Sequence, residues 1–201
     1  MSETSAILTL SLNTFIRYYS LDPSKLVGEI SRRMQKSGGY DFYGMLSDAI
    51  RAKIRGATED EIQFILGRSN NPSEVSYNRT AFDVFMSKFG KKRGLAIFEK
   101  KGRIKLCDGE LIILASPLFS IESSSGFSVY NVWATQNPAL DRVRAGVGVH
   151  LLNKAFQKSA PNYDYKMFDA VEGKVFSTVG NTIPRAIDTV AKTIIDHAKN
   201  G

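Results

Sequence analysis

The chain has 201 residues, of which 43% are hydrophobic, and its 27 basic and 20 acidic residues give a formal net charge of +7. This length and apolar content predict one compact unit with a hydrophobic core, and no apolar run reaches the roughly 18 residues that a membrane-spanning helix requires. The single cysteine, Cys107, excludes an intrachain disulfide and a cysteine-based zinc cage, and the N-terminus lacks the pattern of a secretory signal, so we expect an intracellular, cytoplasmic protein with no membrane partner.

The first 90 residues predict about five short helices, each ending near a glycine. Residues 6–20 fit two patterns, because Leu8, Leu10 and Leu12 alternate as in a strand but also contribute to a helical face, and we favour the helix. The next four helices begin at capping or proline signals, which are Asp22-Pro23, Asp41, Thr58 with Glu61, and Asn71-Pro72. Their ends are expected at Gly38-Gly39, Gly56, Gly67 and Gly90.

A hairpin is the strongest strand signal in the chain. Asp108-Gly109 separates two runs rich in Ile and Leu, and a two-residue type I′ turn needs positive φ at both central positions, which these residue types tolerate. We therefore expect residues 103–107 to pair with residues 110–116. Pro117 cannot donate a backbone hydrogen bond, so it predicts a bend before the next strand, over residues 118–122.

A strand over residues 127–134 is apolar on both faces, which predicts a central strand covered on each side. One face carries Phe127, Val129, Asn131 and Trp133, and the other carries Ser128, Tyr130, Val132 and Ala134. Residues 95–98 predict a short strand that joins the same sheet. A helix is expected from Asn137 or Asp141 to about Gln157, with Val143 among its inward residues and Gly146 and Gly148 close to the sheet.

The C-terminal residues complete an α+β fold. Strands are predicted over residues 166–170 and 174–178, and a final amphipathic helix starts at Thr182-Ile183-Pro184. We expect an N-terminal all-helical half of about five short helices, residues 1–90, packed on a C-terminal mixed, mainly antiparallel β-sheet with two covering helices, residues 91–201.

The positive charge is concentrated in one segment, residues 88–105. It holds eight bases and one acid, Glu99, so it carries the whole net charge of +7, and the other 19 bases and 19 acids cancel. The eight candidate polyanion-binding residues are Lys88, Lys91, Lys92, Arg93, Lys100, Lys101, Arg103 and Lys105. Such a cluster can neutralise several phosphates. Lysines that flank an edge strand also discourage edge-to-edge pairing, and this simpler interpretation stays open.

Most catalytic motifs are absent from the sequence. Gly146-Val147-Gly148 lacks the third glycine of a dinucleotide-binding loop and lies inside a predicted helix. His150 and His197 are the only histidines, and neither belongs to a metal-binding or triad pattern. His150 is expected to be a core imidazole and Cys107 a small buried thiol. We therefore predict no catalytic residue, no metal site and no cofactor, and lean towards a protein that is not an enzyme.

After residue 102 the predicted order is four strands, a helix, a strand and a helix. This order is loosely similar to the core of PD-(D/E)XK nucleases, in which an acid on one strand and an acid-x-Lys on the next hold Mg²⁺. Here the acid-x-Lys position holds Asn131-Val132-Trp133, and the preceding acid is missing near Pro117-Leu118. The similarity implies a degenerate relative without catalytic residues. A divergent metal-dependent hydrolase would instead have to use Glu110, Glu122 and Asp169.

The leading hypothesis is a non-enzymatic module that binds nucleic acid or another polyanion through residues 88–105. Stacking aromatics at Arg17-Tyr18-Tyr19 and residues 40–43 would support it. A helix-turn-helix formed by residues 58–66 and 72–89, with Ser73, Ser76, Tyr77, Arg79 and Thr80 exposed, would also support it. Against this motif, the connection over residues 67–71 is longer than the usual turn and Glu74 would face the DNA. The alternative is a protein-interaction or assembly module, a homo-oligomer or a partner-binding protein, which uses apolar surface at Phe85, Met86 and Phe89.

Overall fold

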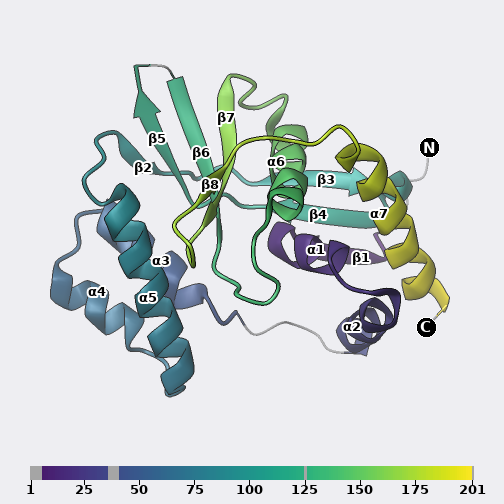
Figure 1. Ribbon diagram of the computed structural model, residues 1–201, viewed down its shortest axis with the longest axis horizontal. Helices are drawn as coiled ribbons and strands as arrows, with labels where there is room; N and C mark the ends of the chain where they lie inside the picture. The colour runs from purple at the N-terminus through teal and green to yellow at the C-terminus, as the bar shows by residue number, and fades with distance from the viewer. Residues whose placement is uncertain (1–5, 36–40, 125, 201) are drawn as a thin grey trace.

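A computed structural model of the protein describes residues 6–35, 41–124 and 126–200 and has an α+β architecture. Its strands form a three-stranded sheet in the order β1-β4-β3 and a five-stranded sheet in the order β2-β5-β6-β7-β8. Helices α6 and α7 lie in front of β3 and β4, and α3, α4 and α5 form a separate layer at the left (Figure 1). No helix in the described part of the chain is both long and apolar enough to cross a membrane.

The three-stranded sheet consists of β1 (Leu8–Ser11), β4 (Leu111–Ala115) and β3 (Gly102–Leu106). Strand β1 runs parallel to β4. The prediction that residues 1–90 are all helical is therefore wrong. Its alternating leucines, Leu8 and Leu10, are buried as the strand pattern requires. Helix α1 (Leu12–Tyr19) follows at once, because the Ser11 hydroxyl accepts a hydrogen bond from the Thr14 amide and caps it. Residues 6–20 therefore contain both elements that the sequence suggested, first a strand and then a helix.

The predicted hairpin between β3 and β4 is confirmed. Asp108 has φ +53° and ψ +25°, and Gly109 has φ +93°, which match the two central positions of a type I′ turn. The Glu110 amide donates to the Cys107 carbonyl at 3.0 Å and closes the turn, η1 (Cys107–Gly109). The strands pair with Leu106 opposite Leu111 and Gly102 opposite Ala115.

The five-stranded sheet consists of β2 (Leu95–Ile97), β5 (Phe119–Ser123), β6 (Gly126–Trp133), β7 (Tyr163–Asp169) and β8 (Val175–Phe176). The central strand β6 is antiparallel to β5 and parallel to β7. Val129 and Trp133 enter one hydrophobic cluster, and Tyr130 and Ala134 enter another. The prediction of a central strand covered on both faces is confirmed.

The first cluster joins helices α1, α2 (Pro23–Gln35), α6 (Arg142–Phe156) and α7 (Ile183–Asn200) to both sheets. Gly148 allows α6 to lie close to β7, since a Cβ at this position would be 2.5 Å from the sulfur of Met167. Val143, which we expected to face inward, is 53% exposed. Val143 lies seven residues before His150 and eleven residues before Lys154, so the three side chains lie on the same outward-facing side of α6.

The second cluster packs α3 (Gly44–Ile54), α4 (Glu59–Leu66) and α5 (Pro72–Phe89) on the other face of the five-stranded sheet. The predicted capping box of α4 is present, with reciprocal hydrogen bonds between Thr58 and Glu61. The predicted apolar surface on α5 is wrong, because Phe85 and Phe89 are buried against Phe119 of the sheet. The expected stop at residues 38–39 lies outside the described residues.

Candidate polyanion-binding surface

Residues 95–123 form one long bent hairpin that crosses from one sheet to the other. Strand β2 pairs with β5, the Phe98 amide continues this ladder by donating to the Leu118 carbonyl, and β3 then pairs with β4. Three residues, 99–101, lie opposite Ser116-Pro117, so the extra residue and the proline produce the bend expected at Pro117. Both β2 and β3 are outermost in their sheets. The basic segment therefore follows a sheet edge from β2 onwards, after a first part on α5 and in the loop that precedes β2.

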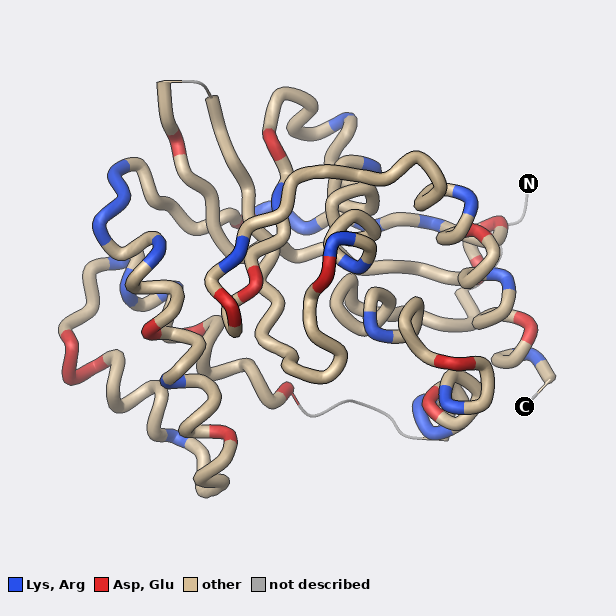
Figure 2. Tube along the Cα trace, in the orientation of Figure 1, with Lys and Arg blue, Asp and Glu red and all other residues tan. Residues whose placement is uncertain are grey.

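All eight candidate bases are exposed, but they lie in groups along this edge rather than in one compact patch. The first group follows the last turn of α5 and the loop to β2, the second lies at the bend, and the third lies on β3. Figure 2 shows this course, with basic stretches at the loop on the left and further ones across the molecule towards β3. The groups comprise Lys88, Lys91, Lys92 and Arg93, then Lys100 and Lys101, then Arg103 and Lys105.

Lys101 of the second group and both bases of the third group form a regular row at alternate positions. Lys101, Arg103 and Lys105 alternate with the buried residues Gly102, Ile104 and Leu106, so the basic side chains share one side of the strand, about 6.6 Å apart. The opposite side packs on the cluster that contains α1, α6 and α7. The outward face also exposes Leu114 of β4 and Thr9 of β1.

Most of these charges have no ion-pair partner among the residues that the structure describes. Six of the bases make no side-chain hydrogen bond or ion pair with another described residue, namely Lys88, Lys91, Lys92, Arg93, Lys101 and Arg103. By contrast, Arg17 and Arg32 both contact Glu29 at 2.9 Å. The positive potential along the edge is therefore available to a ligand.

The same placement agrees with a purely structural role. Strands β2 and β3 leave backbone groups unpaired at their outer edges, and charged side chains at such edges prevent pairing with another chain. Lys91, Lys92, Lys100 and Lys101 flank β2 on both sides. Exposure alone does not separate this role from ligand binding.

The aromatic residues that we expected to stack on bases differ in exposure: Tyr18 is buried, Tyr19, Phe42 and Tyr43 are half-buried, and Tyr40 lies outside the described residues. Tyr18 is 2% exposed, and burial raises the pKa of its hydroxyl. Sequence reasoning missed a more exposed pair, Phe127 and Tyr163, whose rings stack with centroids 4.9 Å apart. Phe127 had been assigned only by alternation to the face that Trp133 shares. The sequence does not show that the packing over this face of β6 begins only at Val129, because that packing depends on segments far away in the chain.

The expected outward face of α5 is exposed, but one member of the proposed helix-turn-helix is not where we placed it. Ser73, Ser76, Tyr77, Arg79 and Thr80 are exposed. Glu74 is 3% exposed and accepts a hydrogen bond from the Ser69 hydroxyl at 2.5 Å, so it would not face DNA.

The three acids considered for metal chemistry lie apart. Glu122 is paired with Phe127 at the start of β6, whereas Asp169 is paired with Trp133, six residues and roughly 20 Å further along. Glu110 forms an ion pair with Lys199 at 2.6 Å. Within the described residues, no group of three His, Cys, Asp or Glu side chains could hold a metal ion.

The remaining candidates for nucleophilic or acid–base chemistry are in environments that suppress it. Burial raises the pKa of the Cys107 thiol, with Glu110 adding to the effect, so the thiolate is disfavoured. Burial lowers the pKa of His150, and Lys154 lowers it further. His150 is half-buried at the rim of an open pocket with Tyr165, whose pKa is raised by burial to about 12.

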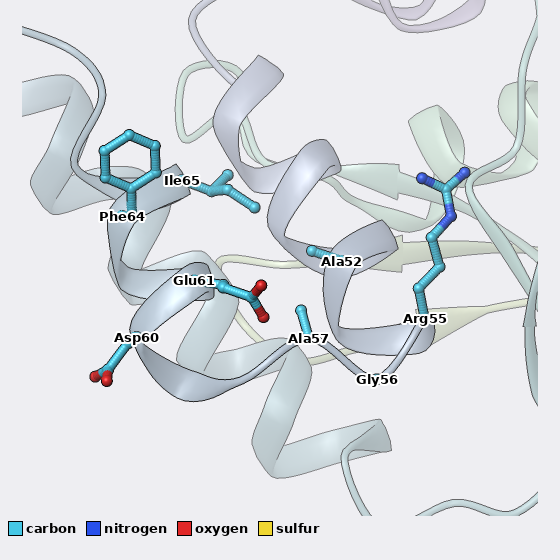
Figure 3. A pocket seen from close by; sticks show the side chains of 8 residues that line it. All are labelled: Ala52, Arg55, Gly56, Ala57, Asp60, Glu61, Phe64 and Ile65. Atoms are coloured by element: carbon cyan, nitrogen blue, oxygen red, sulfur yellow. The ribbon is translucent and has the colours of Figure 1, made fainter.

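A second open pocket lies between the end of α3 and α4 (Figure 3). Glu61 points into it, but its carboxylate accepts hydrogen bonds from the amide and hydroxyl of Thr58 and thereby caps α4. Phe64 lies at the rim and is 74% exposed. The pocket supplies an exposed apolar side chain rather than a catalytic group.

Comparison with known proteins does not assign the chain to a family. No protein-family model matches the chain, and a search of curated proteins finds no match.

Proposed function

We propose that the protein is a non-enzymatic module that binds nucleic acid or another polyanion along the basic edge, defined as Lys88, Lys91, Lys92, Arg93, Lys100, Lys101, Arg103 and Lys105. The observation that supports this proposal most is the row on β3. Lys101, directly before β3, and Arg103, on β3, are exposed on the same side of the chain and have no ion-pair partner among the described residues. Lys101 and Arg103 have no ion pair to break within the described residues, so little reorganisation is needed when phosphates replace water around them.

The chemistry of the edge favours contacts to phosphates. Lysine supplies a point charge on a flexible stem, and six of the eight residues are lysines. Such contacts position a nucleic acid without reading its bases, so we expect little sequence preference. Binding should weaken steeply as salt rises, because each neutralised phosphate releases counterions.

The test is a titration of a fluorescent oligonucleotide at several salt concentrations, with a charge-reversal variant and a matched control. Lys101→Glu/Arg103→Glu alters the row on β3. Arg79→Glu/Arg142→Glu changes the net charge by the same amount at exposed positions on α5 and α6, neither of which has an ion pair within the described residues. Both variants must melt cooperatively, as checked by circular dichroism.

We expect the β3 variant to lose at least tenfold in affinity and the control to lose much less. Equal losses in the two variants would mean that only net charge matters and would contradict the proposed site. A selective loss in the control would move the site to α5, where Arg79 lies on the exposed face. Affinity that does not change with salt would contradict polyanion binding altogether.

A second candidate function is self-assembly through α4, and the exposed ring of Phe64 favours it. A phenylalanine that is 74% exposed beside an open pocket is apolar surface that a second copy could bury. Sedimentation velocity over a concentration series tests this, with Phe64→Ser as the variant. A concentration-dependent dimer that Phe64→Ser abolishes would support assembly, and a monomer at every concentration would contradict it.

A further inference from the structure

Phe127 and Tyr163 form a stacked aromatic pair at the protein surface. They are cross-strand neighbours on β6 and β7, their ring centroids are 4.9 Å apart, and the ring planes differ by 23°. Phe127 remains 36% exposed and Tyr163 is half-buried. The other stacked cross-strand pair, Phe119 and Tyr130, is buried in the second cluster. The two pairs have similar geometry, but only the first presents a ring to solvent.

A base of the proposed binding edge lies against this pair. The ammonium group of Lys100 is 5.8 Å from the centre of the Tyr163 ring and donates a hydrogen bond to the Ser159 carbonyl at 2.8 Å. These two contacts hold a positive charge beside the aromatic pair. Lys100 also sits at the bend of the long hairpin, directly before Lys101 and the row on β3. Lys100 is therefore the cation beside the aromatic pair, and the row that begins with Lys101 continues along the same hairpin with its side chains on the other side of the strand.

We propose that Phe127 and Tyr163 form a stacking platform for an unpaired base, so that the ligand of the basic edge is single-stranded nucleic acid. The inference rests on the proposed function. An exposed ring beside a cation, at a point where a basic segment begins, is a combination that suits single strands, because the ring stacks on a base while the cations contact the backbone. In a duplex, each base is covered by its neighbours and offers no free face to Phe127.

The two rings also pack against other residues of the protein. The test must therefore separate a loss of packing within the protein from a loss of stacking on a base. Tyr163 contacts Phe98 edge-on at a centroid distance of 6.2 Å, so its removal would disturb the first cluster. Phe127 is the better position to change. Phe127→Leu keeps an apolar side chain over Tyr163 and removes the aromatic face. Phe64→Leu is the matched control, because it removes an exposed ring from α4.

The experiment measures binding of an unpaired oligothymidylate, an abasic strand with the same number of phosphates, and a duplex, all at one salt concentration. We expect Phe127→Leu to weaken oligothymidylate binding about 5- to 100-fold, the range found for loss of one base–aromatic contact. Duplex and abasic binding should not change. Phe64→Leu should match the wild-type protein for all three ligands.

The outcomes distinguish this inference from the proposed function. Wild-type affinity for oligothymidylate in Phe127→Leu would overturn the platform, whereas a loss in Lys101→Glu/Arg103→Glu would still support the basic edge. An equal loss for all three ligands in Phe127→Leu would indicate a folding defect and would also overturn the platform. Failure of the wild-type protein to bind any of the three would overturn both.

Discussion

The side-chain oxygen of Asn78 accepts a hydrogen bond from the Leu46 amide at 2.9 Å, which ties the middle of α5 to the first turn of α3. Its amide nitrogen donates to the carbonyl oxygens of Phe42 and Glu74, both at 2.8 Å. Asn78 is fully buried, so its polar atoms depend on these partners. One side chain thus satisfies an amide at the start of α3, where no helical partner exists.

Asn78→Ala should therefore lower the free energy of unfolding by about 1–3 kcal/mol, because it leaves the buried Leu46 amide without an acceptor. Urea unfolding followed by circular dichroism measures this loss. Asn153→Ala is the control, since Asn153 is exposed and its side chain bonds only to the Val149 carbonyl of its own helix. A loss no larger than that of the control would show that water replaces Asn78 at the end of α3.

Gly94 fixes the turn between the basic loop and β2, and replacing it should be costly. Its φ is +72°, and a Cβ there would lie 2.5 Å from the backbone oxygen of Glu122. We expect Gly94→Ala to cost about 1–3 kcal/mol in stability from backbone strain, with a further cost from the contact. Thermal unfolding measures the change. The matched control is Gly28→Ala, which meets no atom within 4 Å inside α2 and should stabilise by about 0.5–1 kcal/mol. A Gly94→Ala protein as stable as the wild type would mean that the basic loop can rearrange freely.

Asp169 should make stability depend on pH in a predictable direction. Burial raises the pKa of this carboxyl above its ordinary value of 3.8, although amides of Val171 and Glu172 donate hydrogen bonds to it. The folded protein therefore holds this proton more tightly than the unfolded chain. The penalty for the charge is absent well below pH 3.8 and develops as the pH rises through the native value.

Asp169→Asn keeps an oxygen acceptor and removes the buried charge. We expect the variant to be at least as stable as the wild type at pH 7, with the difference shrinking as the pH falls towards 3.8. Thermal unfolding of both proteins across this range is the measurement. A variant that is less stable by the same amount at every pH would show that the carboxylate makes a favourable contact that outweighs its burial.

The row on β3 predicts a change in salt dependence as well as in affinity. If Lys101 contacts one phosphate of a single strand, Lys101→Ala should reduce the slope of log K against log salt by about 0.7. Phe127→Leu should leave this slope unchanged, because stacking releases no counterion. Titrations at four or more salt concentrations provide both slopes. An unchanged slope in Lys101→Ala would remove this residue from the phosphate contacts.

Local chemistry accounts for the parts of the fold that could be predicted. The turn at Asp108-Gly109 and the box of Thr58 and Glu61 each involve neighbours in the chain, so their signals are complete within a few residues. The burial of Phe85 and Phe89 could not be predicted, because it depends on α5 lying against Phe119, which is some 30 residues away in the sequence. The same applies to Glu74, an acidic residue that is nevertheless buried.

The sequence by itself determined the α+β class, the position of most helix ends, the hairpin and the concentration of charge in residues 88–105, since these follow from the order and type of neighbouring residues. Only the tertiary structure decided that the part of this segment from β2 to β3 lies at the outer edge of two sheets and that Lys100 within it contacts the stacked pair of Phe127 and Tyr163. The physical reason is that exposure depends on where a covering element ends. Phe127 at the start of β6 is exposed, whereas Val129, two residues further along the same face, is buried in the first cluster.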